Sequence, residues 1–183
     1  MQKYSVAIRF GLVWGISSII YTLIQYLITE NVQSGILSGI LVFLAGIGIM
    51  YYIGIKRREE IGGFISWKEA MTHIWVGGII SSVLTTFFML ILYNFIAPDL
   101  IEQTKEMQIE LIEKFRGSMG DTAADAQIEK LESSNPFSFV NSLLILGGGI
   151  LIQFLLACVV ALAVKNEDPN SNFSKYNQMK DQF

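Results

Sequence analysis

Residues 56–70 read KRREEIGGFISWKEA, and the chain then carries no Asp, Glu, Lys or Arg over residues 70–97. A basic cluster, typical of the point where a hydrophobic helix leaves the membrane, comprises Lys56, Arg57 and Arg58. Ser66 and Glu69 have the spacing of a capping box, in which the Ser66 hydroxyl accepts from the Glu69 N–H and the Glu69 carboxylate accepts from the Ser66 N–H. This stretch therefore predicts the end of one membrane helix and the start of another.

The composition indicates a membrane protein. The chain has 183 residues, of which 52% are hydrophobic, and a mean hydropathy of +0.47, which is too apolar for an ordinary soluble domain. The net charge of −3 is too small to indicate a polyanionic partner, so we expect no nucleic acid. Cys158 is the only cysteine and His73 the only histidine, which excludes an internal disulfide and the usual zinc sites. We expect no cofactor and no metal.

Four segments lack charged side chains for about the 20 residues that a helix needs to cross the hydrocarbon core. They are residues 10–28, 35–55, 70–97 and 139–164. Each must be helical, because an isolated segment in lipid satisfies its backbone polar groups only as a helix, and no alternation typical of a β-barrel occurs. The predicted fold is an all-α integral membrane domain over residues 1–165 with four transmembrane helices.

Small and polar residues recur at helical spacing within these segments. The residues that we expect to pack helix against helix are Gly11, Gly15, Ser18, Gly35, Gly39, Gly46, Gly78 and Gly149. Small side chains let two backbones approach closely, and amides or hydroxyls can bond across the contact. Gln25 and Gln153 are intramembrane amides that such packing would allow to meet. Two interpretations stay open: these faces are packing surfaces of a bundle, or they line a solute pathway.

The distribution of charge predicts the orientation. Nine basic residues fall on the side of the 56–69 loop and both chain ends, against four in the connection between the third and fourth segments. The positive-inside rule then places both termini in the cytoplasm. Trp14, Trp67 and Trp75 are predicted to lie near the cytoplasmic boundary, and His73 to be a polar residue at the same interface. Residues 166–183 are polar and predict a disordered cytoplasmic tail.

The connection over residues 98–138 is the only sizeable region outside the predicted membrane segments, and it carries a net charge of −5. An apolar stripe at helical spacing comprises Leu100, Met107, Leu111 and Phe115, opposite a row of glutamates. We expect an extracytoplasmic helical hairpin that breaks near Gly120, with Asp121 capping its second helix and Asn135 capping the last membrane helix. The stripe either packs internally or meets a partner or the bilayer.

No nucleotide-binding, metal-binding or nucleophile motif occurs in the sequence, so we expect no enzyme. The leading hypothesis is a non-catalytic structural, accessory or interaction protein acting through helix packing and the hairpin, as a homo-oligomer or with a membrane-protein partner in the lipid bilayer. The alternative is a small-solute transporter or channel subunit that uses Gln25, Gln153, Asn141 and residues 147–149. No intramembrane acid or base is present to couple transport to ions.

Two motifs flank the third segment: GGFISWKEA at residues 62–70 and IAPD at residues 96–99. With them, the chain resembles the bacterial membrane family called domain of unknown function 4199 over roughly residues 4–165. The resemblance implies a multi-pass inner-membrane protein, typical of Bacteroidota, with no activity assigned. It therefore brings no catalytic residues to this sequence.

Overall fold

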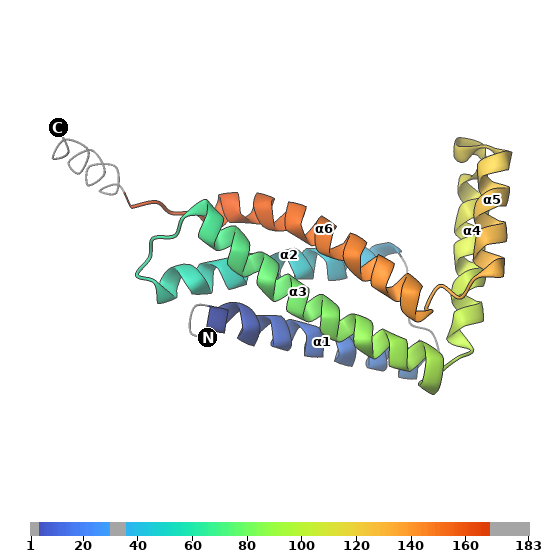
Figure 1. Cartoon of the computed structure of the whole chain (residues 1–183), viewed down its shortest axis with the longest axis horizontal. Coiled ribbons are helices and arrows are strands. Elements are labelled where there is room, and N and C mark those ends of the chain that lie inside the picture. Colours follow the sequence, from blue (N-terminus) through green and yellow to red (C-terminus); the bar gives the residue numbers. More distant parts are fainter. Residues whose placement is uncertain (1–3, 30–35, 169–183) are drawn as a thin grey trace.

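The computed structural model describes residues 4–29 and 36–168, and within them the protein is all-helical (Figure 1). The elements are α1 (Ser5–Thr29), α2 (Ile36–Glu60), α3 (Trp67–Ile91), the π-helical turn η2 (Leu92–Ile96), α4 (Leu100–Met119), α5 (Asp121–Ser133) and α6 (Phe139–Val164). Four of these stretches are long and apolar enough to cross a membrane: α1, α2, α3 with η2, and α6. The predicted all-α membrane fold with four spanning helices is confirmed.

The helices extend beyond the uncharged segments at one end. The first begins at Ser5 and so includes Arg9, and the second runs on to Glu60 and so includes the basic cluster. Absence of charge marks the part of a helix that lies in hydrocarbon, whereas the hydrogen-bonded helix continues into the headgroup region where charges are solvated. The fourth span, in contrast, begins and ends where the sequence predicts, at Phe139 and Val164.

The third helix is the centre of the bundle. It packs against α1, α2 and α6, and Figure 1 shows it running between α1 and α6 along the length of the molecule. The main apolar core lies at the end nearest the α2–α3 loop and comprises Met50, Ile53, Ile65, Ala70, Ile74, Ala157, Val160, Ala161 and Val164. The outer faces of α1, α2 and α6 keep large exposed apolar side chains, as expected for helices surrounded by lipid.

The third helix ends in a π-helical turn, and Pro98 stops the helix directly after it. The Ala97 N–H donates to the Leu92 carbonyl at 2.8 Å, five residues back, and Pro98 has no N–H with which to continue a helix. The wider turn buries Leu92 and Tyr93, which form a second core with Ala97 and Leu100 at this end of the bundle. The ring of Tyr93 stacks on Phe137 with centroids 3.5 Å apart.

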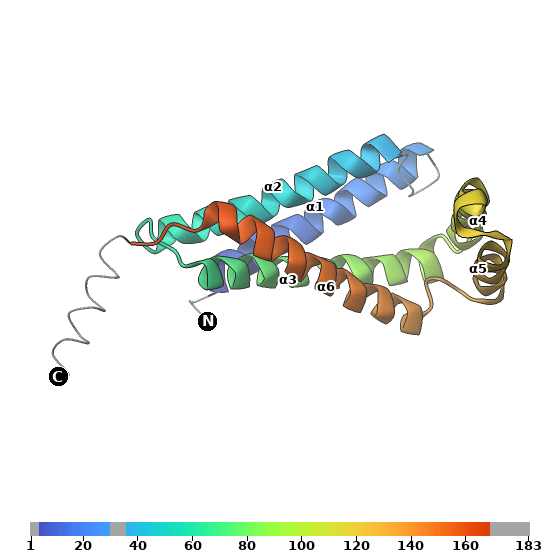
Figure 2. The same cartoon turned by 90° about the horizontal axis from the view of Figure 1, so that it is seen from above.

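The fourth and fifth helices lie side by side across the end of the bundle opposite the α2–α3 loop. Figure 1 shows them running across the direction of the long helices, and Figure 2 shows them nearly end-on. They are joined at Gly120, whose φ of 87° is a backbone conformation that favours glycine. The α4–α5 pair therefore lies crosswise over the end of the bundle and does not continue in the direction of the long helices.

Three details differ from the sequence-based expectations. Gly120 occupies the cap position of α5, and Asp121 is its first helical residue, where its charge still favours the helix N-terminus. The cap of α6 is Ser138, whose hydroxyl accepts from the Asn141 N–H at 3.3 Å. Asn135 instead accepts from the Phe137 N–H through its side chain, so it shapes the turn that precedes the cap.

The start of the predicted tail is tied to the bundle. Asn166 forms a two-way backbone bridge with Ile65, at 2.8 and 3.0 Å, and its side chain donates to the Gly63 carbonyl. Asn166 is therefore ordered, contrary to the expectation of a disordered tail from residue 166. Residues 169–183 lie outside the described residues.

Candidate functional sites in the bundle interior and beneath α4 and α5

The basic cluster connects the ends of three helices. Arg57 donates from Nε and Nη2 to one carboxylate oxygen of Glu69, at 3.2 and 2.8 Å, and from Nη1 to Glu60. Arg58 donates to the Val164 carbonyl at the C-terminus of α6, and Lys56 pairs with Glu59. Arg57 and Arg58 therefore hold α2, α3 and α6 together, beyond any effect on topology, whereas the Lys56 pair lies within α2.

Half of the expected capping box is present. The Ser66 hydroxyl accepts from the Glu69 N–H at 3.3 Å. The Glu69 carboxylate accepts from Arg57 rather than from the Ser66 N–H, because the end of α2 brings a guanidinium within reach. A charge-assisted bond to arginine is stronger than a bond to a neutral amide. The Glu69 carboxylate thus joins α3 to α2 and does not cap its own helix.

The first and third helices approach most closely at glycines. A Cβ on Gly11 would lie 2.6 Å from the Gly77 carbonyl oxygen, and a Cβ on Gly15 would lie 2.9 Å from Leu84. Gly46 makes a similar but looser approach to Trp14, at 3.3 Å. Ser18, which follows on the same face of α1, donates to the Trp14 carbonyl within its own helix. These predicted packing residues line a tight contact between α1 and its neighbours.

Gln153 joins α6 to α3 at mid-membrane depth. Its Nε2 donates to the Ser82 hydroxyl at 2.7 Å, while its Oε1 lies 2.7 Å from the position that a Cβ on Gly78 would take. This oxygen is buried and has no hydrogen-bond partner among the described residues. Gly78 is therefore the residue that makes room for the Gln153 amide.

Gln153 does not meet Gln25. Gln25 lies roughly 30 Å along α1 from Ser5, whereas Gln153 lies roughly 16 Å along α6 from Val164, at 1.5 Å per residue. Both helix ends are at the same end of the bundle (Figure 1), so the two amides are at different depths. This difference in depth was not predictable, because a sequence does not tell how far one membrane helix is shifted along another.

Two further glycines that were predicted to pack helix against helix make no close contact within the described part of the chain. A Cβ on Gly39 or Gly149 would have no other heavy atom of the described chain within 4 Å, apart from its own helix. Both glycines leave a hollow on the helix surface. Gly35, which belongs to the same predicted face as Gly39, lies outside the described residues.

Two open clefts lie on either side of α3 in the membrane-spanning part, and their mainly apolar walls include several hydroxyl side chains. One, of about 280 Å³, lies between α1, α3 and α6 and is lined by Ser18, Ser81, Ser82, Thr85, Thr86 and Gln153, among others. The other, of about 430 Å³, lies between α1, α2 and α3 and includes Ser17, Tyr21, Thr22 and Gly46. Trp14, Ser18 and Thr85 line both. Polar groups at this depth are scarce and are candidates for solute contact.

The aromatic and imidazole groups near the α2–α3 end make specific contacts within the protein. His73 is fully buried, with Nδ1 2.8 Å from the Glu69 carbonyl and its ring 5.0 Å from that of Tyr4. Trp67 and Trp75 donate to the carbonyls of Cys158 and Ile150 on α6. The indoles therefore serve as links between helices, a role that spacing alone does not reveal.

The apolar stripe of α4 divides into a buried part and an exposed part. Leu100 is buried against the end of α3 and Met107 is half-buried. Leu111 and Phe115, nearer the Gly120 turn, are 45% and 58% exposed. Of the alternatives that the sequence left open for the stripe, internal packing therefore applies at the start of α4 and not beyond it.

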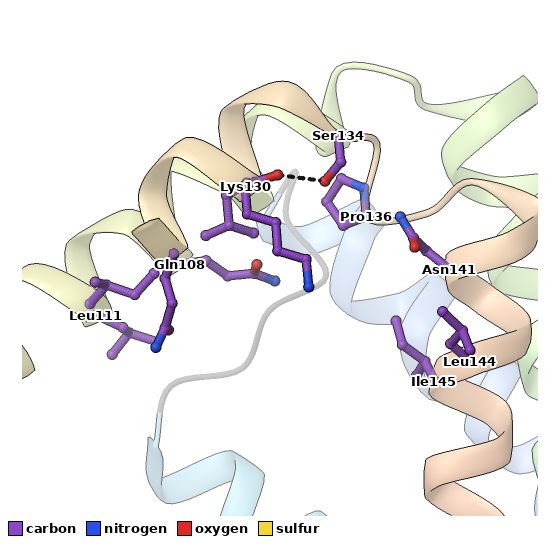
Figure 3. A pocket seen from close by; sticks show the side chains of 11 residues that line it. Gln108, Leu111, Lys130, Ser134, Pro136, Asn141, Leu144 and Ile145 are labelled. Carbon is purple, nitrogen blue, oxygen red and sulfur yellow. Dashed lines mark hydrogen bonds between the residues drawn. The ribbon is translucent and has the colours of Figure 1, made fainter. Parts of the chain in front are cut away.

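A groove of about 630 Å³ lies between the α4–α5 pair and the first turns of α6 (Figure 3). Its lining comprises Gln108, Leu111, Ile112, Gln127, Lys130, Leu131, Ser134, Pro136, Asn141, Leu144 and Ile145. Figure 3 shows Lys130 extending from α5 toward the space that Leu144 and Ile145 bound on the α6 side. No sequence pattern indicated Lys130 as a site residue, because only the fold brings α5 beside α6.

Together, four spanning helices around a central third helix and a crosswise helix pair define a small multi-pass membrane protein. The family described as "Protein of unknown function (DUF4199)" matches residues 9–166, and the chain belongs to that family. This confirms the resemblance seen in the sequence. No curated protein matches the chain, and no solved structure matches it.

Proposed function

We propose that the protein is a non-catalytic component of the bacterial inner membrane that acts by binding another membrane or membrane-associated protein. In this proposal both termini are cytoplasmic, and the α4–α5 pair is the extracytoplasmic binding element. The observation that carries the proposal is the attachment of the start of α4 and of the linker into α6 to η2, which places the pair crosswise over the end of the bundle. A pair that is already positioned in this way is suited to recognition, because binding then has a smaller ordering cost.

The attachment rests on specific contacts. Tyr93 stacks on Phe137, and its hydroxyl is 3.4 Å from that of Thr104 on α4. Asn94 donates to the Phe137 carbonyl at 3.1 Å, so the linker into α6 is bound to the end of α3. The start of α4 and the start of α6 are thus both held by η2, and the pair between them has a defined position.

The surface offered by this pair is acidic. Glu102, Glu106, Glu110 and Glu113 are exposed along α4, and the whole connection has a net charge of −5. Such a surface disfavours polyanions and favours a partner with a basic face, through steering and complementarity. The partner class supported by this charge is a protein with an exposed lysine- or arginine-rich surface.

In-cell photo-cross-linking tests the proposal. A photoreactive phenylalanine analogue at Glu102 is expected to yield a discrete protein adduct, whereas the analogue at Phe87, a lipid-exposed position on α3, is not. Adding Glu106→Lys is expected to weaken the Glu102 adduct severalfold, because it reverses one charge of the surface. Adducts that are equal at both sites, or unaffected by Glu106→Lys, would contradict recognition by this face.

A second candidate function is passage or binding of a small polar solute, favoured by the hydroxyl side chains in the two clefts and by Gln153 in the one between α1, α3 and α6. It predicts saturable solute uptake by liposomes that contain the purified protein, and loss of uptake in Ser82→Ala. The interaction proposal predicts no uptake above that of empty liposomes. The flux measurement therefore separates the two candidates.

A further inference from the structure

One cation of the α4–α5 pair differs from the other three. Lys105 lies 3.8 Å from Glu102, Lys114 lies 2.7 Å from Glu110, and Arg116 contacts three carboxylates. Lys130 has no carboxylate of the described residues within 4.0 Å of its Nζ, although the pair as a whole is acidic. Lys130 is also exposed, so its ammonium is available to an anion from outside the pair.

The position of Lys130 identifies the kind of anion. Its side chain lines the groove whose other wall is formed by Leu144 and Ile145, which are 69% and 61% exposed on a membrane-spanning helix. Ile145 is only about 9 Å along α6 from Phe139, at 1.5 Å per residue. The groove therefore opens where the hydrocarbon meets the headgroups, and its apolar wall continues into the lipid-facing surface of α6.

The other wall completes an amphipathic site. Leu111 and Ile112 supply apolar surface beneath α4, while the side-chain amides of Gln108 and Asn141 line the same space. The volume of about 630 Å³ is in the range of small-molecule sites. An apolar trough with one ammonium and three side-chain amides in its lining, those of Gln108, Gln127 and Asn141, matches a molecule that has an acyl chain joined to a phosphate.

We propose that this groove binds one phospholipid, with its phosphate on the Lys130 ammonium and an acyl chain along Leu111, Leu144 and Ile145. The lipid would fill the space beneath the crosswise pair and join α5 to α6. This inference goes beyond the proposed function, since it requires no protein partner. It depends on the membrane placement of the long helices and on the charge of Lys130.

The test uses the full-length protein, purified in detergent and stripped of lipid, with dioleoyl-phosphatidylethanolamine added and bound lipid counted by native mass spectrometry. Dioleoylglycerol, which has the same acyl chains and no phosphate, is the matched lipid. We expect one phosphatidylethanolamine per protomer and about fivefold weaker binding by Lys130→Gln, the effect of about one surface cation on lipid phosphate. Dioleoylglycerol should bind wild type and Lys130→Gln equally weakly.

Two variants act as controls. Lys114→Gln removes a cation that already pairs with Glu110 within α4, so its binding should equal that of the wild type. Lys130→Arg keeps the charge and should also bind. The proposal is overturned if Lys130→Gln binds the phospholipid as tightly as Lys114→Gln does, or if dioleoylglycerol binds as well as the phospholipid. It is likewise overturned if the mass spectra show a second protein copy, lost on Lys130→Gln, in place of lipid.

Discussion

At the scale of single residues, the contact between α1 and α3 depends on the absence of a side chain. The space at Gly11 is bounded by backbone atoms of α3, with the Gly77 carbonyl 2.6 Å from the Cβ position, so neighbouring side chains cannot relieve a clash by rotating. At Gly39 the corresponding space is empty within the protomer. The two glycines therefore provide a matched pair in which only one is constrained by packing.

We expect Gly11→Ala to lower the free energy of unfolding by about 1–3 kcal/mol, because the added methyl forces two backbones apart. Gly39→Ala should change it by less than about 0.5 kcal/mol. Thermal unfolding of both variants in the same detergent, followed by circular dichroism, measures the difference. Equal losses in the two variants would contradict the assignment of Gly11 to the α1–α3 contact.

Removing one partner of the hydrogen bond between Gln153 and Ser82 should destabilise the protein more than removing the whole Gln153 amide. Ser82→Ala removes the partner of Gln153 Nε2 and leaves an amide whose oxygen is already without a partner, at a cost of about 1–3 kcal/mol. Gln153→Met removes the whole amide at similar volume and should cost less. A double-mutant cycle of thermal stabilities checks this order. A greater loss in Gln153→Met than in Ser82→Ala would show that the amide oxygen is satisfied.

At the scale of helices, Arg116 fixes α5 against α4. Its guanidinium donates to Glu113 on α4 at 2.6 and 2.7 Å and to Asp125 on α5 at 2.7 Å. Lys114, in contrast, pairs with Glu110 within α4. Arg116→Gln should therefore speed amide hydrogen exchange in α5 severalfold at pH 7, and Lys114→Gln should not. Unchanged exchange in both would show that the Gly120 turn and apolar contacts suffice.

The same bonds predict a dependence on pH. Hydrogen bonding from Arg116 lowers the pKa of Glu113 below its ordinary value of 4.5. The stabilising contribution is therefore complete above pH 4.5 and is lost as the pH falls through the lower pKa of the folded state. The thermal stability of the wild type should fall more steeply below this pH than that of Arg116→Gln. Parallel melting curves over roughly pH 3–6 would contradict this coupling.

The helices themselves were largely predictable, whereas their mutual register was not. Uncharged length gave all four spans, and residues 139–164 match α6 without adjustment, because a helix in lipid has no alternative backbone structure. The Gln25–Gln153 pairing failed because spacing within a helix says nothing of depth in the membrane. The same limit applies to the sites: Ser82, Asn166 and Lys130 gain their roles only from neighbours on other elements, which the fold brings beside them.

At the scale of the whole molecule, the two ends of the bundle are chemically different. At one end, Arg57 and Arg58 bind the termini of α3 and α6, and Ile65 pairs with Asn166. At the other end, a pair of acidic helices crosses the bundle over an apolar groove. Polar bonds join the elements at the basic end, and a helix pair with exposed apolar surface covers the acidic end. This asymmetry is the physical basis for the proposed orientation.

The final prediction tests that orientation directly. Translocation of lysine- and arginine-rich segments is disfavoured, so the α2–α3 loop should remain cytoplasmic and α4 should be outside. In a Cys158→Ala background, Glu110→Cys and Phe64→Cys place thiols at exposed positions on the two ends. A membrane-impermeant maleimide should label Glu110→Cys in outer-membrane-permeabilised cells and should label Phe64→Cys only after the inner membrane is opened. Labelling of Phe64→Cys in cells whose inner membrane is intact would reverse the orientation, and the acidic pair would then face the cytoplasm.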